Sequence, residues 1–404
     1  MPTVTPIINS QLDTLNGKLD KQNALLEVMA ASSLRELASD WQGLADLADS
    51  GLFGEAFAIG DQFVDTWMDK ASDQEYTYPY QLNHIGSVEL HDGEALSNRP
   101  FLQAHFAHPF GVQFSHQRAF LKCPNGLSVG TYYFTIESAW GTNVQAGDVV
   151  AFTTTVAVPE GGRVSGCYGA PDQAKNNWRI YTHSADGKTI LETITPVFSV
   201  AGTNLGTIKA SVRNGNLNSM QETAYGWNRW STSALRQYLN SAAGVGAWWI
   251  AQDEWDIAPD QLTTKHGFLS GCSEDFINAI KEVKVVTYPN TVYDDTAGNT
   301  PDITYDKVFI PSIEQMFIQP QKEGEGEYHE YWKRRSGSPT PLARSQTYPQ
   351  MITYAVENHT SAQYVRVRSA NRGYANLTWT VHSSGHVSYN YSSNANRFAP
   401  IVVL

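Results

Sequence analysis

The stretch 363–404 restricts the fold of this chain more than any other part of the sequence. It contains two segments in which apolar and polar residues alternate, 377–381 and 386–391, joined by a turn-like sequence at 382–385. Two alternating segments separated by a short turn predict a β-hairpin. Successive side chains of a strand point to opposite faces, so Trp379 is expected on the face that packs in the core.

The loops around this predicted hairpin are rich in amide, phenol and hydroxyl side chains. Such side chains suit recognition, because they combine flat contact area with adaptable hydrogen bonding. The candidate ligand-binding residues are Asn371, Arg372, Tyr374, Asn376, Tyr389, Tyr391, Asn394 and Asn396. Asparagine is also favoured in turns for backbone reasons, so a structural use of these asparagines is the alternative.

Charge and apolar patterning exclude several classes of partner. The formal net charge is -12 and only 17% of the residues are charged, which disfavours binding to nucleic acid or to an anionic membrane. No apolar run approaches the roughly 20 residues of a membrane-spanning helix, and the first residues lack the pattern of a signal peptide. We therefore expect a protein made in the cytoplasm without insertion into a membrane.

Changes in periodicity along the chain divide it into three predicted parts. Residues 1–52 form a helical segment for oligomerisation or docking, 53–210 a β-rich domain, and 211–404 a mixed domain with helices before strands. The fold class predicted is multidomain: a coiled-coil-like helical segment, a middle β-sandwich or jelly-roll-like domain, and an α+β C-terminal domain.

The first part carries apolar residues at alternating spacings of three and four. This heptad pattern predicts a helix that associates with copies of itself, and packing on its own chain is the alternative. A trimer is our guess, because fibrous assemblies favour cyclic symmetry. The candidate oligomerisation residues are Leu12, Leu15, Leu19, Leu26 and Met29.

Motifs for metal binding and catalysis are missing from the sequence. The three cysteines are far apart and form no CxxC, which predicts neither a disulfide framework nor a zinc site. The histidines lack metal-ligand spacing, so we expect no metal and no cofactor. Nucleophile and phosphate-binding motifs are also lacking. An enzyme acting on cell-wall sugar, with Glu254 and Asp256 as paired carboxylates, is a minor alternative to a protein that is not an enzyme.

Five segments in the second half carry a resemblance to a known family. They are NRWSTSALRQYLNS, GFLSGCSEDFINAI, DKVFIPSIEQM, YVRVRSA and SSGHVSYNYSSNANRFAPIVVL. Together they resemble a C-type-lectin-fold family of unknown function found in bacteriophage structural proteins, over about residues 225–404. The upstream segments IGDQFVDTWMD, PFGVQFSHQRAFL and GTYYFTI are similar to phage virion or fibre proteins. The resemblance implies a C-type-lectin-like C-terminal domain with an exposed binding face.

These observations lead to one functional hypothesis and one alternative. The first is a bacteriophage virion structural protein, as a tail-fibre, head-fibre or decoration component, that displays its C-terminal domain to bind a host-surface glycan or protein. The alternative is a purely structural head or baseplate component that contacts other virion proteins. Both place the protein in the virion and require no bond breaking.

Overall fold

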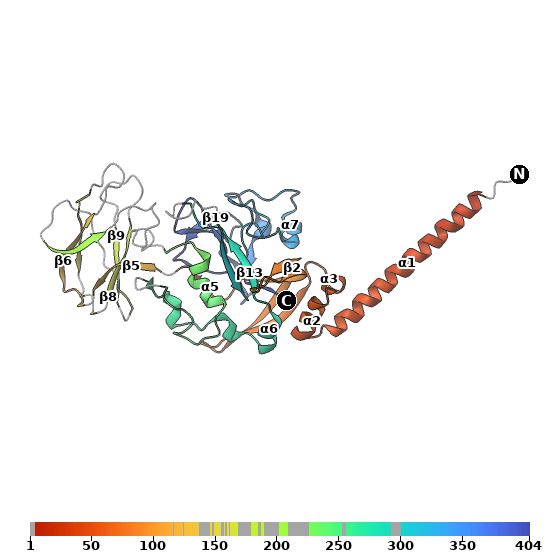
Figure 1. The fold of residues 1–404 in the computed structure, drawn as a ribbon, viewed down its shortest axis with the longest axis horizontal. Helices are drawn as coiled ribbons and strands as arrows, with labels where there is room; N and C mark the ends of the chain where they lie inside the picture. The colour runs from red at the N-terminus through yellow and green to blue at the C-terminus, as the bar shows by residue number, and fades with distance from the viewer. Residues whose placement is uncertain are drawn as a thin grey trace.

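The structure is a computed structural model, and it describes most of the chain (Figure 1). Residues 5–115, 226–252, 256–291 and 300–404 are described. Within 116–225 the strands named below are described, together with short adjoining turns.

The chain begins with three helices, α1 (Thr5–Leu37), α2 (Trp41–Asp49) and α3 (Phe53–Ala56). Helix α2 starts at Asp40, whose carboxylate accepts a hydrogen bond from the backbone N–H of Gly43 at 2.8 Å. It buries Trp41 and Leu44 against the body of the protein. Helix α1 projects away from that body, with the N-terminus at its far end (Figure 1).

A four-stranded sheet joins the two ends of the sequence. Its strands are β1 (Gln62–Asp69), β2 (Gln74–Glu89), β3 (Ala95–Ala104) and β21 (Ile401–Val403), in the order β1-β2-β3-β21. Strand β21 pairs antiparallel with β3, with Val402 opposite Leu102. Both of these side chains are fully buried. The apolar C-terminal segment is therefore a buried strand of this sheet.

The strands between 117 and 208 lie at the end of the molecule opposite α1 (Figure 1). One sheet has the order β10-β9-β8-β5-β12 and another the order β11-β6-β7. Their bounds are β5 (Gln117–Cys123), β6 (Gly130–Ile136), β7 (Val149–Thr154), β8 (Gly162–Tyr168), β9 (Arg179–Ser184), β10 (Gly187–Thr189), β11 (Thr203–Ile208) and β12 (Asp256–Ile257).

The remainder of the chain forms short helices and small sheets. The helices are α5 (Ala234–Leu239), α6 (Glu274–Ala279) and α7 (Glu330–Ser336), with 3-10 turns η1 (Trp230–Thr232), η2 (Asp260–Thr263), η3 (Phe268–Gly271) and η4 (Pro349–Met351). The two-stranded sheets pair β13 (Val283–Thr287) with β14 (Asp302–Asp306), β15 (Thr353–Tyr354) with β16 (Ala362–Gln363), and β20 (Ala395–Asn396) with β4 (Val112–Gln113).

The predicted C-terminal hairpin is confirmed. Strands β17 (Val365–Ala370), β18 (Leu377–Val381) and β19 (Val387–Tyr391) form one antiparallel sheet. In its hairpin Trp379 lies opposite Tyr389. The connecting turn contains Gly385 with φ of 81°, a backbone conformation that favours glycine. Trp379 is 4% exposed, so its predicted burial is confirmed. The other side chains of β18 are buried as well, so this strand is covered on both faces, whereas the alternation predicted burial on one face only.

The predicted fold class is wrong. The structure is a mixed α/β arrangement, mostly of strands in small sheets, and not a coiled-coil-like segment followed by a sandwich and a C-type-lectin-like domain. Strands β1 to β3 form a sheet with β21 and not a sandwich with the strands that follow them. Alternation identifies a strand from neighbouring residues, whereas the pairing of β3 with β21 depends on residues about 300 positions apart, which no local pattern encodes.

Helix α1 also differs from the predicted coiled-coil-like segment. Among the described residues no second helix runs along it, and the side chains of Leu15, Leu19, Leu26 and Met29 are 54–63% exposed. Leu12 lies in α1, but its side chain is outside those described. Self-association through these residues stays a prediction, which the mass of the chain in solution would test. The boundaries at residues 52 and 210 also stay predictions.

Candidate functional site

The eight predicted ligand-binding residues separate into a buried group and an exposed group. The asparagines Asn371, Asn376 and Asn396 are only 3–8% exposed. Tyr374, Tyr389 and Tyr391 are 38–49% exposed. Asn394 is exposed, and Arg372 is partly buried. The structure therefore places the phenol rings on the surface and uses three of the four asparagines inside the fold.

The loop 371–377 is held in place by an asparagine from a distant part of the chain. The side-chain amide of Asn228 donates hydrogen bonds to the backbone carbonyl oxygens of Tyr374 at 2.6 Å and Leu377 at 2.7 Å. Asn371 closes the loop from within, because its backbone N–H donates to Leu377 and its side chain accepts from Gly373. Asn371 and Asn228 are thus positioning residues for Tyr374, and the sequence offered no signal for Asn228.

The exposed rings form what we call the tyrosine surface, made of Tyr374, Tyr389 and Tyr391. The rings of Tyr374 and Tyr389 are stacked, with centroids 6.1 Å apart and an angle of 28° between their planes. Tyr389 and Tyr391 are two residues apart on β19 and so lie on the same face. The surface thus offers adjacent aromatic rings to solvent from a hairpin and the loop beside it.

Buried side chains next to this surface hold it in place. Trp379 meets Tyr389 edge to face at a centroid distance of 5.8 Å, and its indole N–H donates to Gln321 Oε1 at 3.0 Å. The same oxygen of Gln321 accepts the backbone N–H of Arg372 at 2.9 Å. Arg372 donates through Nη1 to the carbonyl of Pro289, and burial lowers the pKa of its guanidinium. Arg372 therefore braces the loop.

The remaining predicted residues lie at the turn after β19. The side-chain amide of Asn394 donates to Asn390 Oδ1 at 2.7 Å, and Asn396 Oδ1 accepts from Asn390 Nδ2 at 3.3 Å. The buried guanidinium of Arg366 donates to the carbonyls of Tyr391 and Asn394. These bonds fix the turn, so Asn396 contributes to structure, while Asn394 remains accessible at the edge of the tyrosine surface.

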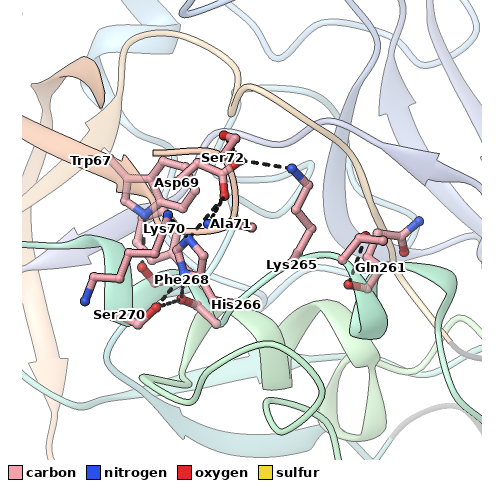
Figure 2. Close-up of polar contacts among 12 residues, drawn as sticks. Trp67, Asp69, Lys70, Ala71, Ser72, Gln261, Lys265, His266, Phe268 and Ser270 are labelled. Carbon is pink, nitrogen blue, oxygen red and sulfur yellow. Dashed lines mark hydrogen bonds and ion pairs between the residues drawn. The ribbon is translucent and has the colours of Figure 1, made fainter. Parts of the chain in front are cut away.

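A second cluster contains the residue types of a serine hydrolase (Figure 2). His266 Nε2 lies 3.3 Å from Asp69 Oδ1, and Ser270 Oγ is hydrogen-bonded to His266 Nδ1. Asp69 also accepts from Lys265 Nζ at 2.9 Å and from Ser72 Oγ at 2.9 Å. A Ser-His-Asp arrangement is catalytic only when the nitrogen that faces the serine is free to accept its proton.

The hydrogen bonds around His266 exclude that role. The backbone N–H of Lys70 donates to His266 Nε2 at 2.7 Å, so the ring proton is assigned to Nδ1. Ser270 Oγ donates to the carbonyl of Gly267 at 2.8 Å and therefore accepts from Nδ1. The imidazole has no lone pair for the serine proton. The cluster instead joins the turn after β1 to the segment that contains η3, where Trp67 donates to the carbonyl of Phe268 at 2.9 Å.

This cluster predicts an acid-sensitive contribution to stability. Burial raises the pKa of the Asp69 carboxyl, but hydrogen bonds from Lys265 and Ser72 outweigh it, so that the pKa is lowered in the folded protein. A lowered pKa means that the folded state binds fewer protons, so its stabilising contribution is lost as pH falls below about 4. We expect Asp69→Asn to be less stable than wild type at pH 7 and to converge with it in acid. Urea unfolding at several pH values measures this, with Glu75→Gln as the control expected to keep the wild-type profile.

The remaining candidate sites from the sequence are the histidines and the carboxylate pair of Glu254 and Asp256. Within the described residues no group of three or more histidine, cysteine or acidic side chains could hold a metal ion. His108 is buried between the hydroxyl groups of Tyr78 and Tyr238. Asp256 is 3% exposed and accepts from the backbone of Gln252 at 2.6 Å. Glu254, its supposed catalytic partner, lies outside the described residues.

The fold and the site together define a β-rich mixed α/β protein with an exposed aromatic surface on its C-terminal sheet. Residues 201–404 match a family described as a domain of unknown function, DUF6273, and the chain belongs to this family. No curated protein and no solved structure was found to match. Among the described residues no helix is long and apolar enough to cross a membrane. The relation to a C-type-lectin-fold family and to phage structural proteins stays a prediction.

Proposed function

We propose that this protein binds a carbohydrate on a cell surface through the tyrosine surface, without breaking bonds. One observation carries the proposal: Tyr374 and Tyr389 are stacked on each other and yet remain 49% and 43% exposed. Large aromatic rings are usually buried against neighbouring side chains. An exposed pair of rings that carry hydroxyl groups is typical of surfaces that contact a partner.

The chemistry of the surface favours a sugar. The faces of the tyrosine rings suit stacking against the C–H face of a pyranose, and the phenol hydroxyls with Asn394 offer hydrogen bonds to sugar hydroxyls. Tyr389 lies on a hairpin in contact with Trp379, and Tyr374 lies on a loop held by Asn228. Because both rings are already positioned, little conformational entropy is lost on binding.

We further propose that the protein is a component of a bacteriophage particle that displays this surface to the host. The support is the sequence resemblance of both halves to phage structural proteins. A single surface of this size would bind weakly, and several copies on one particle would raise the apparent affinity.

The alternative role is structural, with another virion protein covering the tyrosine surface. In that case Tyr389 would be protected from chemical iodination in assembled particles.

The proposed function predicts a specific loss of binding. The whole chain should bind immobilised bacterial wall polysaccharide or mucin glycans, and Tyr389→Ala should weaken binding about tenfold by removing one ring of the stacked pair. Tyr354→Ala is the matched control, because Tyr354 is also exposed but belongs to β15, which is in a different sheet from β19. Absence of glycan binding, or equal losses in both variants, would contradict the proposal.

A further inference from the structure

A cavity of about 400 Å³ lies away from the tyrosine surface, between β2, β3, β13 and the segment 324–329. This volume falls within the range of small-molecule sites, roughly 300–1,000 Å³. Its apolar walls include Val88, Phe101 and Phe309. Its polar lining comes from residues far apart in the sequence.

The segment 324–329 is held rigidly at the cavity wall. Gly324 and Gly326 have φ of 109° and 140°, which a residue with a side chain rarely adopts. Glu325 between them is buried, with Oε1 accepting the backbone N–H of Tyr288 at 2.8 Å. Glu314 accepts the N–H groups of Gly324 and Glu325 at 3.0 and 2.7 Å. The wall is therefore formed before any ligand arrives.

A second wall of the cavity contains a distorted part of β2. The β2–β3 register shifts between Leu82 and His84 and again between Gly86 and Val88. Such bulges redirect side chains. His84 Nε2 lies 2.8 Å from Glu327 Oε2. A Cβ on Gly86 would lie 2.7 Å from His84 Nε2 and 3.2 Å from Glu327 Oε2, so the absence of a side chain there leaves room for this pair.

A buried histidine of the lining has unused hydrogen-bonding capacity. His329 is 1% exposed and its ring stacks on that of His84, with centroids 5.2 Å apart. Neither ring nitrogen of His329 has a hydrogen-bond partner among the described residues. Burial lowers the pKa of His329 well below its usual value, so the ring is neutral and one nitrogen can accept a hydrogen bond. Leaving such a buried group without a hydrogen-bond partner is unfavourable, so a ligand that donates to it gains affinity.

The charges around the cavity favour a cation. The charged lining residues are Glu89, Glu325, Glu327, Lys284 and Arg368. Lys284 Nζ pairs with Glu89 at 2.8 Å, and Arg368 faces Glu325. Among the described residues the ion-pair partner of Glu327 is His84, and the Glu327 side chain is 68% exposed at the mouth. The lining thus carries one more carboxylate than permanent cations.

We propose that this cavity binds a small organic cation with a primary ammonium group and an apolar body. The ammonium group donates hydrogen bonds to the Glu327 carboxylate and the neutral ring of His329, and the apolar body packs between Phe101 and Phe309. The same charges disfavour an anion.

Three probes of matched shape and different charge test the proposal on the whole chain. Benzylamine carries the ammonium group, benzyl alcohol replaces it with a neutral hydroxyl, and benzoate is an anion. In ligand-observed saturation-transfer NMR we expect benzylamine to bind with a Kd of about 1 mM, as small ligands of this size do. Benzyl alcohol should bind about fivefold more weakly, because it forms no charge-assisted hydrogen bond, and benzoate should give no signal.

Variants locate the binding. Glu327→Gln should weaken benzylamine binding about fivefold, whereas Glu330→Gln, in α7 outside the cavity lining, should leave it unchanged. Ala95→Phe places a ring at an exposed position of the lining and should abolish binding. Tyr389→Ala should have no effect, which separates this site from the tyrosine surface. No binding of benzylamine, equal binding of benzyl alcohol, or an unaffected Glu327→Gln variant would overturn the proposal.

Discussion

Replacing Arg368 with alanine is expected to lower the free energy of unfolding by about 3–5 kcal/mol. The Arg368 guanidinium is 1% exposed, and it donates to the carbonyl of Ile310 at 2.8 Å and also to Gln315 and the carbonyl of Glu325. Alanine would remove these hydrogen bonds, leave Gln315 Oε1 with the backbone N–H of Ser312 as its donor, and take away the cation that partly offsets the rise in the pKa of Glu325 caused by burial. Unfolding in urea measures the loss.

The control for this prediction is Arg334→Ala. Arg334 is 59% exposed and pairs with Glu330 on the surface of α7, an interaction worth at most about 1 kcal/mol. Both variants replace an arginine with alanine. A difference between their free energies of unfolding therefore measures the effect of burial and of the hydrogen bonds. A loss below about 1 kcal/mol for Arg368→Ala would show that the segment 324–329 does not depend on this guanidinium.

The second large effect is expected for Trp67→Ala, at about 3–5 kcal/mol. Trp67 is 1% exposed, its ring stacks on His266 and Phe268, and its N–H donates to the carbonyl of Phe268. Gly271 lies so close that an added Cβ would be 2.7 Å from the indole nitrogen. A cavity would open where β1 meets the segment that contains η3.

Val64→Ala tests whether burial causes this effect. Val64 is on the same strand as Trp67 but is 63% exposed, so its truncation should change stability by no more than about 0.5 kcal/mol. Comparable thermal melting temperatures for the two variants would refute the role assigned to Trp67.

Local patterns were sufficient for the C-terminal hairpin. The alternation at 377–391 gave both strands, the turn and the burial of Trp379, because each of these depends on neighbouring residues. The same pattern could not separate Asn371 and Asn376 from Tyr374 as ligand-binding candidates. An asparagine whose amide bonds to the nearby backbone and one whose amide faces a ligand look alike in the sequence. The structure separates them, because it shows Asn228 holding the backbone of this loop from a distant part of the chain.

The cavity residues had no detectable signal in the sequence. His84 and Glu327 are 243 residues apart, and the segment around Gly324 and Gly326 resembles a polar loop in its composition. Its glycines and acidic residues have that composition, but the buried contacts of Glu325 with Ser369 and Tyr288 arise from tertiary structure. The predicted fold class failed for the same reason, since β21 and β3 meet across most of the chain.

Because β21 pairs with β3, the residues that match the family do not contain a complete sheet around β21. The matched residues 201–404 include β21, but its neighbour β3 lies outside them. A fragment cut at the limits of the match would carry the fully buried Ile401, Val402 and Val403 with no strand to cover them. Such a fragment would expose an unpaired, apolar edge, the kind of surface on which polypeptides aggregate.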